Sequence, residues 1–124
     1  MNVTLAVAAG GALGSVLRYW FSRLTHAVVA TTFPLGTLLV NVLGSFAIGL
    51  LYVWLVERSA ARAELRAFLM VGVLGGFTTF SSFSLETVNL VAQSDYGRAA
   101  VNSAGSLALC LGGTLAGMMI GRQL

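Results

Sequence analysis

Polar side chains inside long apolar stretches are the residues of this chain with the clearest potential for chemistry. Asn41 has Thr37 one helical turn before it and Ser45 one turn after it, so the three form a polar stripe on one helix face. A hydroxyl can bond to a carbonyl of its own helix, but the amide of Asn41 brings two N–H donors that cannot all be satisfied locally. Polar groups in hydrocarbon cost free energy, so we expect Asn41 to serve an ion pathway or a key structural role.

A second candidate is the segment GGFTTFSSFS at 75–84, in which two adjacent glycines are followed by five hydroxyl residues set among three phenylalanines. Glycine and β-branched residues both lower helix propensity, so the segment predicts a helix that breaks near the middle of a membrane. A broken backbone at that depth is tolerated only where it is buried in protein or lines a water-filled site. Its free carbonyls and amides could then bind ions.

Phe80 and Phe83 stand three residues apart, so their rings project from one side if the segment after the break is helical. A phenyl ring has a positive edge, and two such edges could contact an anion without the tight hold of a fixed positive charge. The alternative is that both rings fill a core or face lipid. The spacing alone does not separate the two roles.

The elements that must position these residues are transmembrane helices. Apolar residues make up 57% of the 124 residues and charged residues only 9%, whereas a soluble domain has about 25% charged residues. A bilayer core about 30 Å thick needs roughly 20 apolar residues per helix. Small clusters of charge separate four such spans, at residues 3–24, 33–56, 66–93 and 97–121. We therefore expect one all-α domain over residues 1–124 that is embedded in a membrane.

Other residues exclude several functions. The single cysteine, Cys110, excludes an intrachain disulfide and a cysteine-based zinc site. His26 stands alone in a predicted loop, which favours a solvated residue over a metal ligand. The sequence has no base paired with a nucleophile, no metal-ligand spacing of histidines and carboxylates, and no phosphate loop, so we do not expect an enzyme. The first span has no basic start and three more spans follow, which argues against a cleaved signal peptide.

The arginines fall near the predicted helix ends, as is typical of membrane flanks rather than of a nucleic-acid surface. We assume that the N-terminus, residues 57–66 and the C-terminus share one side of the membrane. That side carries Arg58, Arg62, Arg66 and Arg122, and the other side carries Arg18, Arg23 and Arg98. Four against three is too small a difference to fix an orientation. The count permits a weakly biased single topology or a dual topology in which both orientations pair as an antiparallel dimer.

Glycines four residues apart indicate close helix packing. They are Gly10 and Gly14 in the first span, Gly72 and Gly76 in the third, and Gly113, Gly117 and Gly121 in the fourth. Small residues at this spacing let helix backbones approach closely in lipid. A bundle this thin cannot enclose a wide pore alone, so we expect it to oligomerise.

Three stretches together closely resemble the Fluc (CrcB) family of fluoride channels. They are GGFTTFSSFSLE at 75–86, Gly10-Gly11-Ala12-Leu13-Gly14 leading to Arg18-Tyr19, and Gly36-Thr37-Leu38 leading to Asn41. The resemblance covers the whole chain in the length, order and number of its helices. It implies a fluoride-selective channel of the cell inner membrane that exports fluoride from the cytoplasm and confers fluoride resistance.

The resemblance also implies the assembly and an ion site. Family members are antiparallel, dual-topology homodimers with four helices per subunit and a third helix broken in mid-membrane. A structural sodium ion on the two-fold axis is held by carbonyls of the break, which in this chain are those of Gly75 and Thr78 from both subunits. Main-chain carbonyls can replace the hydration shell of a small cation without a charged side chain.

Two fluoride pores along the dimer interface, each lined by both subunits, are a further implication. The family's phenylalanine pair matches Phe80 and Phe83, and its pore asparagine matches Asn41. Arg18 matches an arginine near an aqueous vestibule, where a positive charge would raise the local anion concentration. The remaining polar residues expected along the path are Thr37, Thr79, Ser81, Ser82 and Ser106.

The roles of two residues, Cys110 and Glu86, are not settled by the resemblance to the family. Cys110 follows Asn102 and Ser106 at four-residue spacing, where the family tends to show a track of hydroxyls, and a thiol is a poorer donor than a serine hydroxyl. Glu86 matches a glutamate near the end of the pore. It could be a pore-mouth residue or the partner of an arginine.

Two other classes of membrane protein remain as alternatives. A small multidrug-resistance exporter is also a dual-topology dimer of four-helix subunits, but its chemistry needs an acidic residue in the first span. Residues 3–24 contain no Asp or Glu. A membrane scaffold that transports nothing would leave Asn41 and the hydroxyl run without a role.

Overall fold

Four helices in the computed structural model, which describes residues 2–124, are long and apolar enough to cross a membrane. They cover Val3–Val28, Leu35–Glu57, Ala63–Ala92 and Tyr96–Gln123. The described residues form no strand. The prediction of an all-helical membrane protein with four spans is therefore confirmed, and the predicted boundaries lie within a few residues of the observed ones.

The first helix, α1 (Val3–Val28), extends one turn beyond its predicted end. Asn2 caps its start, because the side chain accepts a hydrogen bond from the Leu5 N–H at 2.8 Å. No glycine or proline follows Arg23 until Pro34, so nothing in the sequence stops the helix before the Thr31-Thr32-Phe33 stretch. His26 consequently lies in the last turn of the helix rather than in a loop.

The second and fourth spans pack closely against each other. The second consists of α2 (Leu35–Tyr52) and the π-helical turn η1 (Val53–Glu57), and the fourth is α6 (Tyr96–Gln123). A Cβ added at Gly117 of α6 would collide with the Phe46 carbonyl oxygen of α2. Glycine at this position therefore permits the backbone contact that the four-residue spacing predicts.

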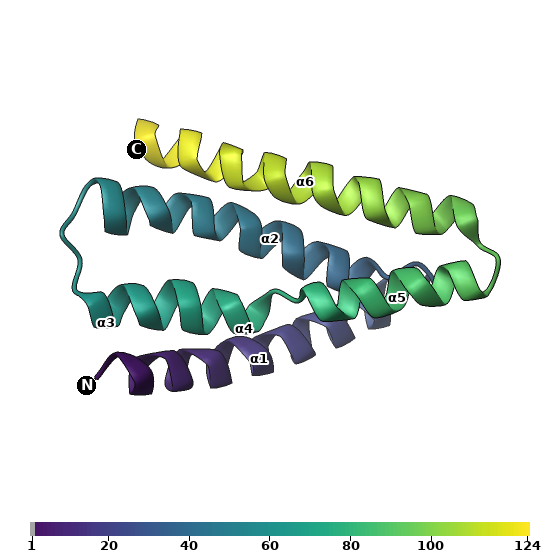
Figure 1. Cartoon of the computed structure of the whole chain (residues 1–124), viewed down its shortest axis with the longest axis horizontal. Coiled ribbons are helices and arrows are strands. Elements are labelled where there is room, and N and C mark those ends of the chain that lie inside the picture. Colours follow the sequence, from purple (N-terminus) through teal and green to yellow (C-terminus); the bar gives the residue numbers. More distant parts are fainter. Residues whose placement is uncertain (1) are drawn as a thin grey trace.

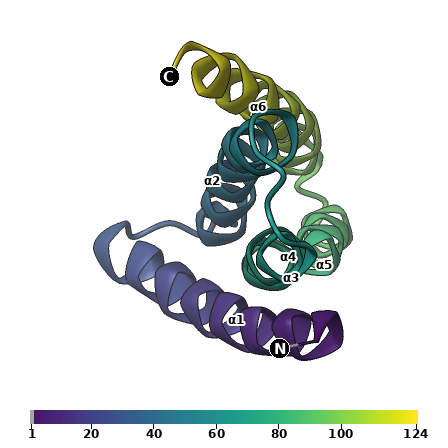
Figure 2. The ribbon, with the colours of Figure 1, turned by 90° about the vertical axis from the view of Figure 1, so that its left-hand side faces the viewer.

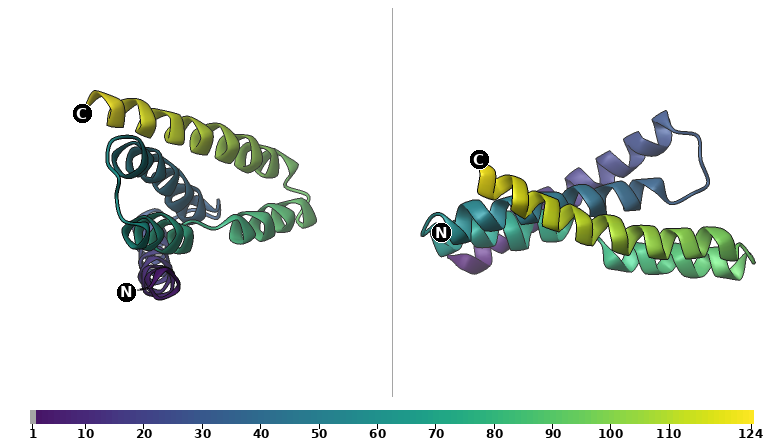
Figure 3. Two further views of the ribbon diagram at one scale, coloured as in Figure 1. Left: turned by 60° about the vertical axis from the view of Figure 1, so that its left-hand side comes forward. Right: turned by 90° about the horizontal axis from the view of Figure 1, so that it is seen from above.

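The third span is interrupted in its middle (Figure 1). Its first half contains α3 (Ala63–Arg66), the π-helical segment η2 (Ala67–Leu74) and α4 (Gly75–Phe77). Its second half is α5 (Phe80–Ala92). Thr78 and Thr79 between them are extended, with ψ angles of 158° and 112°. This extended link displaces α5 sideways from α4, so the two halves do not share one axis (Figure 3).

The spans pack in two pairs when the molecule is seen from the end that carries the termini (Figure 2). One pair is α1 with the first half of the third span, and the other is α2 with α6. Both termini and the link at 58–62 lie at one end of the bundle, and the links at 29–34 and 93–95 lie at the other (Figure 1). This is the arrangement of chain ends that we assumed for the arginine count.

Arg18 does not belong among the arginines that flank the membrane spans. Its Nε donates to the carbonyl oxygen of Gly76 at 3.1 Å, which places the guanidinium beside the break instead of at a helix end. Without Arg18, the end with the termini has four flanking arginines and the other end has Arg23 and Arg98. The bias is larger than the sequence indicated, so the charge count gives less support to dual topology than we expected.

The packing of α1 against η2 yields a matched pair of variants. A Cβ at Gly14 would collide with the Val73 carbonyl oxygen, whereas a Cβ at Gly11 meets nothing within 4 Å. We expect Gly14→Ala to lower the free energy of unfolding by about 1–3 kcal/mol, because the two backbones must separate. Gly11→Ala should leave it unchanged or raise it by up to about 1 kcal/mol, because alanine has the higher helix propensity. Unfolding of both variants in mixed detergent micelles, followed by circular dichroism, measures the difference, and equal stabilities would contradict this packing.

Candidate functional site

Asn41 on α2 satisfies both backbone groups of Thr79 in the break. Its Nδ2 donates to the Thr79 carbonyl at 3.0 Å, and the Thr79 N–H donates to its Oδ1 at 2.7 Å. The Thr79 hydroxyl in turn caps α5 by accepting a hydrogen bond from the Ser82 N–H at 3.1 Å. One amide thus replaces the helical hydrogen bonds that Thr79 loses at the break. The structural role expected for Asn41 is present, and its role in a pathway stays a prediction.

Two further side chains satisfy carbonyls next to the break. Arg18 donates to the Gly76 carbonyl, as described above, and the Thr78 hydroxyl donates to the Leu74 carbonyl at 2.9 Å. The Arg18 contact connects α1 to α4 at the depth of the break. The guanidinium therefore has a structural partner besides any effect that its charge has on ions.

No hydrogen bond among residues 2–124 ends on the carbonyl oxygen of Gly75 or Thr78, whereas those of Leu74, Gly76 and Thr79 all have donors. Both residues line the same cavity. Gly75 is exposed in the single chain. Two backbone oxygens without donors are ligands of the kind that a hard cation prefers, so the residues present fit the expected sodium site.

The cavity beside these carbonyls has a volume of ≈ 360 Å³ and is here called the central cavity. Its lining includes Asn41, Thr79, Phe80 and Phe83 but no charged side chain. The two phenyl centroids lie 5.4 Å apart with their planes inclined at 52°. Phe80 is 75% exposed, so in the single chain its ring projects from the surface of α5.

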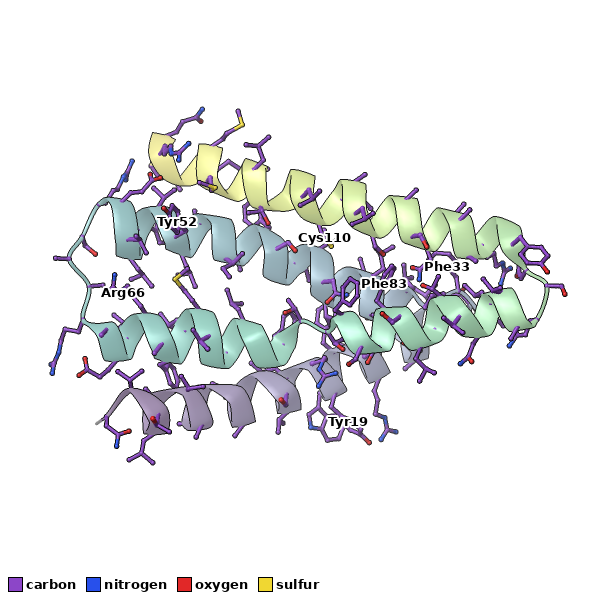
Figure 4. All side chains as sticks on the ribbon, in the orientation of Figure 1. Tyr19, Phe33, Tyr52, Arg66, Phe83 and Cys110 are labelled. Carbon is purple, nitrogen blue, oxygen red and sulfur yellow. The ribbon has the colours of Figure 1, made fainter. Side chains whose placement is uncertain are left out.

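Ser106 and Cys110 of α6 line the same cavity from the opposite side. The labelled Phe83 and Cys110 lie on the facing sides of α5 and α6 (Figure 4). Ser106 is only 7% exposed, and its buried Oγ has no hydrogen-bond partner among the described residues. A buried hydroxyl without a partner costs free energy, so Ser106 has a donor available for a bound species.

A second cavity, of ≈ 540 Å³, lies beside α1 and is here called the polar cavity. Arg18, Arg23 and His26 line it from α1, and Ser82 and Glu86 line it from α5. Thr79 lines both cavities. The break therefore separates a polar chamber lined by charged side chains, two arginines and one glutamate, from an uncharged chamber lined by the phenylalanines.

Glu86 pairs with a hydroxyl and not with an arginine. Thr37 donates to its Oε1 at 2.7 Å, while Oε2 is buried without a partner. The three ion pairs among residues 2–124 all lie at the ends of the bundle, and none includes Glu86. No arginine of the described chain therefore pairs with Glu86, and its placement at a pore mouth stays a prediction.

The hydroxyl residues expected along a path do not all lie together. Thr37 and Ser82 line the polar cavity, Ser106 lines the central cavity, and Thr79 lines both. Ser81 lines neither cavity, and its Oγ lies 3.3 Å from the Thr79 hydroxyl on the exposed side of α5. The two cavities thus account for four of these hydroxyls but not for that of Ser81.

The sequence did not indicate two contacts near the site. Asn102 of α6 is almost completely buried and donates to the Thr87 hydroxyl at 2.9 Å. The His26 Nε2 accepts a hydrogen bond from the Gly36 N–H at 3.2 Å, which joins the end of α1 to the start of α2. An asparagine in an apolar span was a usable signal for the first contact. Nothing in the spacing of His26 indicated the second.

The fold and the site together define a multi-pass membrane protein with a polar helix break in mid-span. The model of the family described as CrcB-like protein, Camphor Resistance (CrcB), matches residues 5–118. A protein of Coxiella burnetii is 46% identical over 125 residues, and one of Geobacter sulfurreducens is 46% identical over 124, with both chains covered completely in each case. A protein of Opitutus terrae is 53% identical over 113 residues, which are 90% of this chain and 86% of the relative.

All three relatives are named fluoride-specific ion channel FluC. This chain belongs to the CrcB family, as its resemblance in the third span indicated. The relatives are ion channels, in agreement with the expectation that the chain is not an enzyme. The family also sets aside the multidrug exporter and the scaffold as alternatives.

The contact between Asn41 and Thr79 predicts a local effect of truncation. Asn41→Ala leaves both backbone groups of Thr79 without partners, and each unsatisfied buried group costs about 1–3 kcal/mol. We expect faster amide hydrogen exchange at residues 78–82 and a lower thermal midpoint. Mass spectrometry of the exchanged protein in nanodiscs measures the first effect, with residues 108–112 of α6 as the internal reference. Unchanged protection at 78–82 would show that Asn41 does not hold the break.

Proposed function

We propose that this chain forms a fluoride-selective channel of the cell inner membrane that lets fluoride leave the cytoplasm and so confers fluoride resistance. The observation that carries the proposal is the central cavity at the helix break. It joins two phenyl rings and an unpartnered buried hydroxyl, and no fixed charge lines it. Membership of a family whose relatives are named fluoride-specific channels supports the same conclusion.

The proposed assembly is an antiparallel, dual-topology homodimer. Gly75, Phe80 and Ser81 are exposed in the single chain although they stand in the middle of a membrane span. Lipid cannot replace the hydrogen bonds missing at a broken helix, and each unsatisfied group there costs several kcal/mol. A second protein surface must therefore cover this face, and a second copy of the chain supplies one. The antiparallel arrangement comes from the resemblance to the family and not from the arginine count.

Each proposed pore runs from the polar cavity through Thr79 to the central cavity, where the second subunit completes the walls. Arg18 would raise the anion concentration at the entrance, since its charge lines the polar cavity. Beyond Thr79 the anion meets the ring edges of Phe80 and Phe83 and the hydroxyl of Ser106. Several neutral donors can replace the hydration shell of fluoride without trapping it.

The proposed structural sodium ion lies on the two-fold axis of the dimer. The carbonyls of Gly75 and Thr78 from each subunit would hold it, and their lack of hydrogen-bond donors supports this assignment. When bound, the ion supplies positive charge close to both pores. It belongs to the assembled structure and is not transported.

Export needs no energy source other than the membrane potential. Moving one elementary charge across 100 mV is worth about 2.3 kcal/mol, so an interior that is negative drives an anion outward. A passive path with high selectivity is therefore sufficient for fluoride resistance. A path that also conducted chloride would dissipate the potential that drives fluoride out.

The phenyl rings provide the test of this function. Phe80→Ile and Phe83→Ile keep a bulky apolar side chain but remove the aromatic quadrupole. We expect fluoride efflux from proteoliposomes to fall at least about 100-fold in each variant, while gel filtration still shows a dimer. Asn41→Asp should also abolish efflux, because it replaces the amide donor with a negative charge.

Leu85→Ile serves as the control for these variants, since Leu85 is exposed on α5 and lines neither cavity. It should conduct at the rate of the unchanged protein. Normal fluoride efflux from intact dimers of Phe80→Ile, Phe83→Ile and Asn41→Asp would rule out the proposed pore.

The dual topology predicts that the C-terminus lies on both sides of the membrane in one population of cells. A single cysteine added after Leu124, in a Cys110→Ser background, should be labelled only in part by a membrane-impermeant maleimide. Permeabilised cells should show complete labelling. Complete labelling or complete protection in intact cells would show one orientation and contradict the antiparallel dimer.

A further inference from the structure

A chain of two hydrogen bonds connects α6 to the backbone of Phe83. Asn102 Nδ2 donates to the Thr87 hydroxyl at 2.9 Å, and that hydroxyl donates to the Phe83 carbonyl at 2.7 Å. The Thr87 hydroxyl has a single proton, which it donates in the hydrogen bond to the Phe83 carbonyl. Only the lone pairs of this hydroxyl therefore remain to accept the hydrogen bond from Asn102. Both partners are therefore oriented, and neither bond can reverse its direction.

Apolar packing holds α5 only weakly in the single chain. Of its 13 residues only Leu90 is buried, whereas α2 buries five of its 18 residues. Side chains of α2 form hydrogen bonds with Thr79, which caps the start of α5, and with Glu86 within α5. Among the described residues, Asn102 is the one side chain of α6 that forms a hydrogen bond to α5. The orientation of α5 toward α6 thus depends on this amide.

Asn102 is not placed to contact a passing ion. The residue is only 2% exposed, and neither Asn102 nor Thr87 lines the central cavity or the polar cavity. It stands one helical turn before Ser106, whose hydroxyl does line the central cavity. On the polar face of α6, Asn102 is therefore buried in a contact with α5, whereas Ser106 lines the central cavity.

We propose that Asn102 is a positioning residue of the channel. Acting through Thr87, it fixes the rotation of α5 about its own axis and so keeps the ring of Phe83 against the central cavity. Loss of the hydrogen bond between Asn102 and Thr87 would let α5 turn. The ring edge of Phe83 would then move away from the ion path, although no group that contacts the ion is removed. This inference rests on the proposed function, in which Phe83 contacts fluoride.

The first test uses the hydroxyl of Thr87. Thr87→Val keeps the shape of the side chain but removes the hydroxyl, whereas Thr87→Ser retains it. We expect Thr87→Val to lower fluoride efflux about tenfold and Thr87→Ser to conduct normally, because positioning depends on the hydroxyl and not on the methyl group. Thr25→Val is the matched control, since the Thr25 hydroxyl makes the same kind of bond to the Phe21 carbonyl at 2.9 Å, away from α5. It should conduct normally.

The second test separates positioning from folding. Asn102→Leu alone could destabilise the chain by leaving Thr87 unpartnered, but replacing both partners by apolar groups of similar shape can be nearly neutral. The double variant Asn102→Leu, Thr87→Val should therefore form dimers with a thermal midpoint near that of the unchanged protein. Its fluoride efflux per dimer should still be about tenfold lower, because apolar contact does not fix a rotation.

The outcomes are distinct. Normal efflux from the double variant, together with loss of efflux in Phe83→Ile, would overturn the positioning role and leave the proposed function intact. A double variant that no longer forms dimers would also overturn the inference, because Asn102 would then be a residue of assembly. Normal efflux from Phe83→Ile would remove the proposed function itself, and the inference with it.

Discussion

A lipid bilayer offers no hydrogen bonds to a polypeptide backbone, and the third span is built around this constraint. Its helix stops at Phe77 and starts again at Phe80, so groups that a continuous helix would pair are freed in mid-membrane. Asn41 forms hydrogen bonds with both freed groups of Thr79, and Arg18 donates a hydrogen bond to the carbonyl of Gly76. These contacts explain why an amide and a guanidinium lie inside an apolar bundle.

The same constraint makes the remaining polar groups available for function. The carbonyls of Gly75 and Thr78 and the hydroxyl of Ser106 have no partner in the described chain, and all three residues line the central cavity. Fixed charge is kept apart from them, since Arg18 lines the polar cavity on the other side of Thr79. In the proposed pore, a charge at the entrance would attract anions, while neutral donors farther in would allow them to leave again.

Much of this arrangement could be predicted from the sequence, because it depends on local patterns. The length of the apolar stretches predicted the four spans, and the GGFTTFSSFS segment predicted the break. The depth of Arg18 could not be predicted, since it depends on a contact with Gly76, 58 residues away. The relay from Asn102 to Phe83 was missed for the same reason. Spacing along one helix shows which residues share a face, but it does not show which other helix that face meets.

We propose that the assembled protein conducts fluoride and discriminates against chloride at the broken helix. The most direct test of this proposal is anion efflux from proteoliposomes that contain the purified, unmodified protein, with ion-selective electrodes for fluoride and chloride and valinomycin to balance the charge. We expect rapid fluoride efflux from every liposome that holds a dimer, and chloride efflux no faster than from empty liposomes. Equal efflux of the two anions, or no fluoride efflux from intact dimers, would contradict it.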